Sequence, residues 1–176
     1  DYQQKETFIK WNPAIKTKND QEALLQGVID NYIDVIATDH APHTKEEKKN
    51  KYLNAPSGGP LVQHALPALL QMYHQEKISL EKIVEKMCHN PAILFQIEKR
   101  GFIRQGYKAD LVLVDLNSPW AVQPSNTIYK CGWSPFEGVT FKSRVTHTFV
   151  NGRLVYKNFK FLPFAHGAEQ LTFDRE

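Results

Sequence analysis

The sequence predicts a mixed α/β fold in two units, on the strength of three observations. Two β-prone runs at 7–11 and 34–38 enclose a helical stretch, which together have the length of a βαβ unit. Helical patterns then continue to about residue 98, and strands punctuated by glycine dominate from there on. We therefore expect a first unit over 1–98 and a strand-rich second unit over 99–176.

The first unit begins with a short strand at 7–11, which Pro13 ends because proline cannot continue the pairing. Asp20 is the expected cap of a helix whose apolar stripe runs from Ala23 to Ile29. The run 34–38 is nearly all apolar and β-branched, which is typical of a parallel strand buried on both faces.

A polar, lysine-rich stretch at 45–51 is interpreted as a solvated loop, and glycine and proline forbid regular structure over 55–60. The helical pattern of 61–75 tolerates Pro67 only with a kink or a late start.

Two more helices are expected before the second unit. Ser79 caps one of them, and Asn90-Pro91 begins a short one that ends near Phe95.

The second unit is expected to open with a buried strand at 110–115. Later, the runs 146–150 and 153–156 flank Asn151-Gly152, the pair that favours a two-residue type I′ turn. This pattern predicts a β-hairpin.

Composition excludes several classes of protein. Among 176 residues, 41% are hydrophobic and 23% charged, a globular balance, and the formal charge of +3 is too small to indicate nucleic-acid binding. No apolar run is long enough to span a membrane, and the first residues do not resemble a signal peptide. Cys88 and Cys131 lack C-x-x-C spacing, so we expect two ordinary thiols in a reduced, cytoplasmic setting.

The most informative stretch is 37–44, which reads A-T-D-H-A-P-H-T at the carboxyl end of the expected buried strand. Loops at such strand ends build the active sites of α/β proteins. Asp39, His40 and His43 therefore form a candidate metal or acid/base cluster, in which a carboxylate beside a hydrolytic metal would ligate it and carry a proton. The alternative, that Asp39 caps a helix and both histidines are solvated, stays open.

Two further candidate binding positions lie before and after this stretch. Asn12 would offer its amide to a planar polar ligand, or it simply forms a turn before Pro13. The segment 56–60 would close over the same pocket, since glycine allows close approach of the backbone, or it is a mobile connector.

Other aromatic and imidazole side chains are interpreted as structural. The tryptophans are expected to pack, and three histidines in helical patterns are expected at the surface or satisfied in the core. These residues are Trp11, Trp120, Trp133, His64, His74 and His89.

Five segments in order resemble dihydroorotase, a pyrimidine-pathway family of the amidohydrolase superfamily. The stretch 37–44 resembles the signature at the family's last barrel strand, and 10–16 (K-W-N-P-A-I-K) resembles its K-x-N-P-P-[LI]-R segment. Residues 55–67 resemble its glycine-containing substrate loop. Residues 100–112 and 134–138 resemble parts of the superfamily's β-sandwich, which allantoinases and hydantoinases share.

The resemblance implies the last two βα units of a (β/α)8 barrel over 1–98, followed by a β-sandwich lobe. It implies reversible, metal-dependent hydrolysis of dihydroorotate to N-carbamoyl-aspartate, with zinc as the metal. Asp39 would be both metal ligand and proton shuttle, Asn12 and His43 would hold the substrate, and backbone groups at Pro56 and Gly58 would meet the ring amide.

The chain also departs from the family pattern. Lys16, Ser57 and Gln63 stand where the family usually has arginine, an aromatic residue and glutamate. No stretch before Asp39 holds the family's His-x-His pair, carboxylated lysine and further histidines, so we expect a carboxyl-terminal portion that is inactive alone.

The partners expected from the resemblance are the substrate and the amino-terminal part of the enzyme, and a second copy of the chain is a further possible partner. Two alternative functions stay open: another cyclic amidase activity, and a non-catalytic role in assembly.

Overall fold

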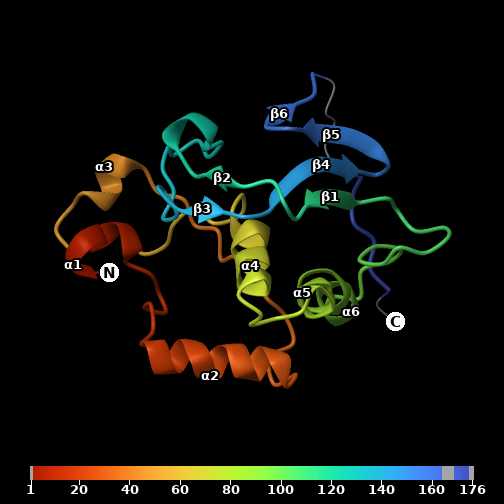
Figure 1. The fold of residues 1–176 in the computed structure, drawn as a ribbon, viewed down its shortest axis with the longest axis horizontal. Helices are drawn as coiled ribbons and strands as arrows, with labels where there is room; N and C mark the ends of the chain where they lie inside the picture. The colour runs from red at the N-terminus through yellow and green to blue at the C-terminus, as the bar shows by residue number, and fades with distance from the viewer. Residues whose placement is uncertain (1, 164–168, 175–176) are drawn as a thin grey trace.

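The computed structural model describes residues 2–163 and 169–174, and the remainder of the expected second unit, 164–168 and 175–176, lies outside the described residues. Helices occupy the first part of the chain and antiparallel strands the second. Figure 1 shows the main sheet above α4, α5 and α6, with α2 at the opposite edge of the molecule.

The helical part contains six α-helices, one 3₁₀ helix and one π-helix among the described residues. They are α1 (Tyr2–Lys5), the 3₁₀ helix η1 (Glu6–Ile9), α2 (Lys18–Ile29), α3 (Lys45–Lys48), α4 (Ala65–His74), α5 (Leu80–Val84), the π-helix η2 (Glu85–His89) and α6 (Asn90–Leu94). None of the helices in the described ranges is long and apolar enough to cross a membrane.

Local signals explain where these helices begin. Thr17, rather than the expected Asp20, is the N-cap of α2; Asp20 is the third residue of the helix, and its carboxylate completes a capping box by accepting the Thr17 amide at 3.1 Å. The late start expected from Pro67 is confirmed, because α4 begins at Ala65 and places the proline in its first turn. Ser79 caps α5 as expected.

The expected strand at 7–11 is wrong. Residues 6–9 form η1, where Thr7 and Ile9 are buried and the Thr7 hydroxyl donates to the Lys48 carbonyl. Tertiary contact therefore overrides the β-propensity of these residues.

The expected parallel strand at 34–38 is also absent, as no ladder forms there. The Ile36 amide donates instead to the Lys86 carbonyl at 3.0 Å, and the Asn90 side chain donates to the Asp34 carbonyl at 2.7 Å. A strand requires a hydrogen-bonded neighbour. The parallel pairing that the described residues do provide is a single bridge between His40 and Gly59.

Two antiparallel sheets follow. The larger has the order β1-β4-β5-β6, and the smaller pairs β2 with β3. The strands are β1 (Leu111–Asp115), β2 (Trp120–Ala121), β3 (Thr140–Phe141), β4 (Arg144–Val150), β5 (Arg153–Lys157) and β6 (Lys160–Phe161), with a 3₁₀ turn η3 at Pro124–Asn126.

The hairpin expected at Asn151-Gly152 is confirmed. Val150 pairs with Arg153, and the two turn residues have φ of 51° and 77°, which a type I′ turn requires. The strand expected at 110–115 is present as β1, but it is not buried, since Val112 and Leu113 are 48% and 49% exposed.

A hydrophobic core joins the helices to the sheet. Its centre is Val28 of α2, Leu70 of α4, Ile83 of α5 and the nearby Ile78. Val114 and Leu116, in and just beyond β1, pack against the same cluster, so the helical and strand-rich parts share a core.

Candidate functional site

Three segments that the sequence analysis singled out meet in the structure. The Ala41 amide donates to the Gly59 carbonyl at 3.3 Å, and the Gly58 amide donates to the Lys10 carbonyl at 2.9 Å. The stretches 10–12, 39–44 and 55–60 are thus joined by main-chain hydrogen bonds, although they are far apart in sequence.

Asp39 stands at the exposed end of this assembly. Its backbone has a φ of 44°, in the left-handed region, which aspartate tolerates better than most residues but which still costs about 1 kcal/mol. The Asp39 side chain is exposed to solvent, so a ligand can reach its carboxylate.

The two histidines of the signature stretch contact the 55–62 segment. His40 Nδ1 accepts the amides of Leu61 at 3.0 Å and Val62 at 3.3 Å. His43 Nε2 lies 3.1 Å from the Ser57 carbonyl, to which it must donate, because a carbonyl only accepts. The alternative in which both histidines are merely solvated and Asp39 caps the next helix is therefore not supported, since Thr44 is the N-cap of α3.

The remaining expected site residues differ in their surroundings. Asn12 is exposed, whereas the carbonyls of Pro56 and Gly58 face inward and accept the Lys48 ammonium at 3.0 and 2.9 Å. Gly58 has a φ of 108°, and a β-carbon there would lie 2.7 Å from that of Ala41. Only glycine fits this close approach.

Lys48 is the site residue that the sequence analysis missed. The stretch 45–51 was expected to be a solvated loop, but 45–48 form α3 and the Lys48 side chain is 0% exposed. Thr44 and Glu47 form a capping box, a sequence signal for this helix. The signal locates the helix start and does not reveal that its last lysine is buried.

Trp133 also holds the site together. Its indole Nε1 donates to the His43 carbonyl at 2.7 Å, and it packs with Trp11 against Gly59, where a β-carbon would lie 2.6 Å from the Trp11 ring. The expectation that these tryptophans pack is confirmed, since Trp133 is 3% exposed.

His64 anchors a polar group behind the site. Its Nδ1 lies 3.1 Å from the Tyr129 hydroxyl and 3.0 Å from the Ser134 hydroxyl, and these two oxygens also accept the amides of Gln63 and Phe136. Burial lowers the pKa of His64 to about 4, and burial raises the pKa of Tyr129 to about 12. Both groups are therefore neutral at pH 7.

The donor set for a metal is partial. The exposed Asp39 carboxylate suits one position of a zinc site, but within the described residues no group of three or more His, Cys, Asp and Glu side chains is placed to hold a metal ion.

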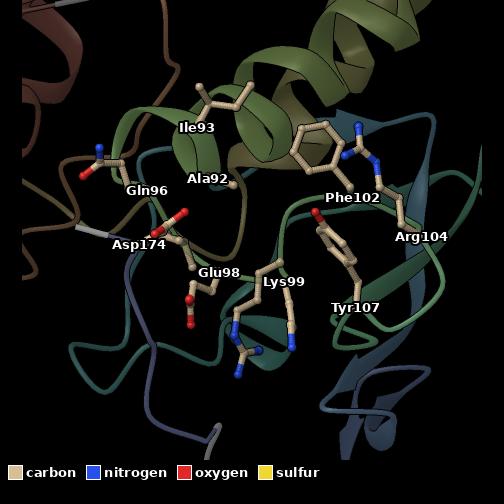
Figure 2. Close-up of a pocket in the computed structure, with 11 residues that line it drawn as sticks. Ala92, Ile93, Gln96, Glu98, Lys99, Phe102, Arg104, Tyr107 and Asp174 are labelled. Atoms are coloured by element: carbon tan, nitrogen blue, oxygen red, sulfur yellow. The ribbon is translucent and has the colours of Figure 1, made fainter. Parts of the chain in front are cut away.

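A separate hollow lies beside α6. It has a volume of about 560 Å³, and Figure 2 shows Phe102, Arg104 and Tyr107 on one side of it and Gln96, Glu98 and Asp174 on the other. The Arg104 guanidinium lies 4.3 Å from the centroid of the Phe102 ring. None of the expected site residues lines this hollow.

Comparisons with known proteins identify the family and similar chains. The sequence model of the Amidohydrolase family matches residues 14–155 of this chain. The chain is 42% identical over 132 residues to a dihydroorotase of Halobacterium salinarum, covering 75% of this chain and 31% of that protein. It is 40% identical over 149 residues to one of Anoxybacillus flavithermus, covering 84% and 35%. The chain thus spans about a third of the length of these relatives.

Solved structures show the same fold. The L-hydantoinase (dihydropyrimidinase) from Arthrobacter aurescens matches with a TM-score of 0.84 at 27% identity, covering 92% of this chain and 37% of that one. A D-hydantoinase matches with a TM-score of 0.81 at 22% identity, covering 88% and 35%.

Proposed function

The chain belongs to the amidohydrolase family, and on that premise we propose that it is the carboxyl-terminal part of a dihydroorotase, which opens and closes the cyclic amide of dihydroorotate. The observation that carries the proposal is the junction of 39–44 with 55–60 through Ala41, His43 and Gly58. The curated relatives named dihydroorotase support the choice of substrate.

In the proposed enzyme this chain contributes the end of a (β/α)8 barrel and most of a β-sandwich lobe. The segment 34–39 would then find its strand partners in the amino-terminal part of the barrel. When bound, zinc would supply Lewis acidity toward water and the substrate carbonyl, and Asp39 would be one of its ligands.

Asp39 has the further role of moving a proton. Its carboxylate would take the proton of the attacking water and return it to the ring nitrogen as the C–N bond breaks. The exposure of the side chain leaves it accessible for both transfers.

His43 and Asn12 would orient the substrate, with His43 at the carboxylate. Because His43 Nε2–H donates to the Ser57 carbonyl, the position of this loop sets the orientation of the His43 ring. The stretch 56–58 would lie beside the ring amide, with the Pro56 and Gly58 carbonyls held on Lys48.

The two roles separate in the kinetics of the full-length native protein. Asp39→Asn should lower kcat by about 100-fold or more, since an amide cannot shuttle a proton. His43→Ala should leave kcat within a few-fold and raise KM by about 10-fold, the loss of one charge-assisted hydrogen bond. An Asp39→Asn enzyme with normal kcat, or a His43→Ala enzyme with normal KM, contradicts the assigned role.

A hydantoinase or allantoinase activity is the second candidate, favoured by the L-hydantoinase match at 27% identity. Ultraviolet absorbance after mixing the full-length protein with dihydroorotate, hydantoin or allantoin distinguishes them. We expect turnover of dihydroorotate, and turnover of the other two alone rejects the proposal.

A further inference from the structure

Lys48 is a fully buried lysine whose charge is balanced by carbonyl oxygens. Its Nζ donates to the carbonyls of Lys10 at 3.2 Å, Pro56 at 3.0 Å and Gly58 at 2.9 Å. An ammonium group has three N–H bonds, and all three are used. No carboxylate among the described residues forms an ion pair with it, and the Trp11 ring centroid lies 5.6 Å away.

Burying an ammonium without a carboxylate is costly unless each of its donors is satisfied. Burial, and then the positive charge of Lys10, lower the pKa of Lys48. The three carbonyls come from the two segments that the proposed function assigns to the substrate, so the ammonium fastens these segments to each other.

The loop carbonyls point alternately to opposite sides. The carbonyls of Pro56 and Gly58 face Lys48, while the Ser57 carbonyl between them faces His43 Nε2. The chain bends at residue 57, and Gly58 has a φ of 108°, which turns the neighbouring carbonyls in different directions. Fixing two of them on Lys48 therefore fixes the third toward His43.

We propose that Lys48 is a positioning residue of the site, which holds the backbone of 56–58 so that the Ser57 carbonyl stays on His43 Nε2 and fixes the orientation of that imidazole. This inference rests on the proposed function for the identity of the substrate. The role belongs to the ammonium as a three-fold hydrogen-bond donor, and Lys48 itself does not touch the substrate.

The first test compares Lys48→Met with Lys49→Met in the full-length native protein. Lys49 is the next residue, is exposed and has no side-chain bond to the loop. We expect Lys48→Met to raise KM for dihydroorotate at least 10-fold with a smaller change in kcat, and Lys49→Met to change neither by more than 2-fold. Unchanged KM in a folded Lys48→Met enzyme overturns the proposal.

Chemical rescue separates positioning from general stability. In Lys48→Ala, n-propylammonium replaces the missing atoms, whereas tetramethylammonium carries the charge without an N–H donor. Saturable recovery of KM with the former alone is expected, and if Lys48→Met does not fold, this comparison decides. Equal recovery of KM with both ions, or no recovery with either ion, rejects the proposal.

Amide hydrogen exchange without substrate keeps the two hypotheses distinct. The peptide over 54–62 should be protected in the wild-type protein and should exchange at least 10-fold faster in Lys48→Met, while the Lys49→Met control stays protected. This result in a protein that does not turn over dihydroorotate rejects the proposed function and retains the fastening by Lys48. Unchanged exchange overturns the fastening itself.

Discussion

Two lysines among the described residues are buried, and different partners balance their positive charges. Lys86 is 1% exposed and lies 3.4 Å from the Glu85 carboxylate, which is itself at the surface. Lys48 has three carbonyl oxygens instead. The Glu85 carboxylate balances the charge of Lys86. The three carbonyls balance the charge of Lys48 and also hold together the two chain segments that carry them.

His64 is held neutral by its surroundings. A protonated ring would have only two hydroxyl oxygens beside Nδ1, and Nε2 is buried without a hydrogen-bond partner in the described residues. Aromatic rings surround it, including those of Trp120 and Phe141 at centroid distances of 5.9 and 6.3 Å. A charge at this position has almost no compensation.

The stability of the protein should therefore fall in mild acid. The pKa of His64 is about 4 when folded and 6.5 when unfolded, so the unfolded state binds more protons between these values and stability is complete only above pH 6.5. We expect the free energy of unfolding in urea to drop by about 2 kcal/mol from pH 7 to pH 5 through this group.

His64→Phe should abolish that part of the pH dependence. His89→Phe is the matched control, because it keeps the stacking on Phe102 that His89 makes at 4.4 Å. A pH dependence that is identical in wild type and His64→Phe contradicts the assignment.

At the scale of elements, one carboxylate joins the segment after α6, the start of β1 and the hairpin turn. Asp110 Oδ2 accepts the Arg100 guanidinium, and its Oδ1 accepts the Asn151 amide at 2.7 Å. The Gly152 amide donates to the Ala109 carbonyl at 2.9 Å. The turn between β4 and β5 is thus docked on the start of β1.

Removing this carboxylate should be costly. Asp110→Ala leaves the guanidinium of Arg100, a residue only 8% exposed, without its partner, and we expect a loss of about 3 kcal/mol in the free energy of unfolding. Lys108→Ala removes an exposed pair with Glu169 and should cost less than about 1 kcal/mol. Equal losses in a thermal or urea denaturation series would show that burial does not matter here.

Sequence signals located the elements that depend on local chemistry. Ser79, Pro67 and Asn151-Gly152 act within a few residues, and the helices and hairpin they predict are present. The strands expected at 7–11 and 34–38 require hydrogen-bonded neighbours far away in sequence. In the described residues, contacts with Lys48, Lys86 and Asn90 take the place of that pairing.

The candidate site follows the same division. Three segments were recognised from their residue types and from a family resemblance: one with Asn12, one with Asp39 and His43, and one with Gly58. The structure joins all three. Lys48 was missed because a lysine in a K-E-E-K-K run is ordinarily solvated, and its burial depends on carbonyls up to 38 residues away.

At the scale of the whole molecule, an apolar face of the main sheet is exposed. A hollow of about 480 Å³ lies between the start of α4 and the sheet, and Val112 and Phe161 at its rim are 48% and 63% exposed. Exposed apolar patches of this kind promote association.

The isolated 176-residue chain should accordingly self-associate, and sedimentation velocity at increasing concentration measures it. Val112→Lys with Phe161→Lys should shift the distribution toward monomer, because two charges interrupt the patch. Tyr32→Lys, at a side chain that is 85% exposed but outside the hollow, is the control. Equal shifts with both sets would assign association to another surface.

The hydrogen bonds of Lys48 have a consequence for mutational tolerance. They bind main-chain oxygens, so the backbone conformation of the loop does not depend on which side chain follows Pro56. Ser57 can stand where the family usually has an aromatic residue, while Gly58, wedged against Ala41, has no such freedom. Under random mutation and selection for function, position 57 should therefore accept many different residues, whereas position 58 should remain glycine.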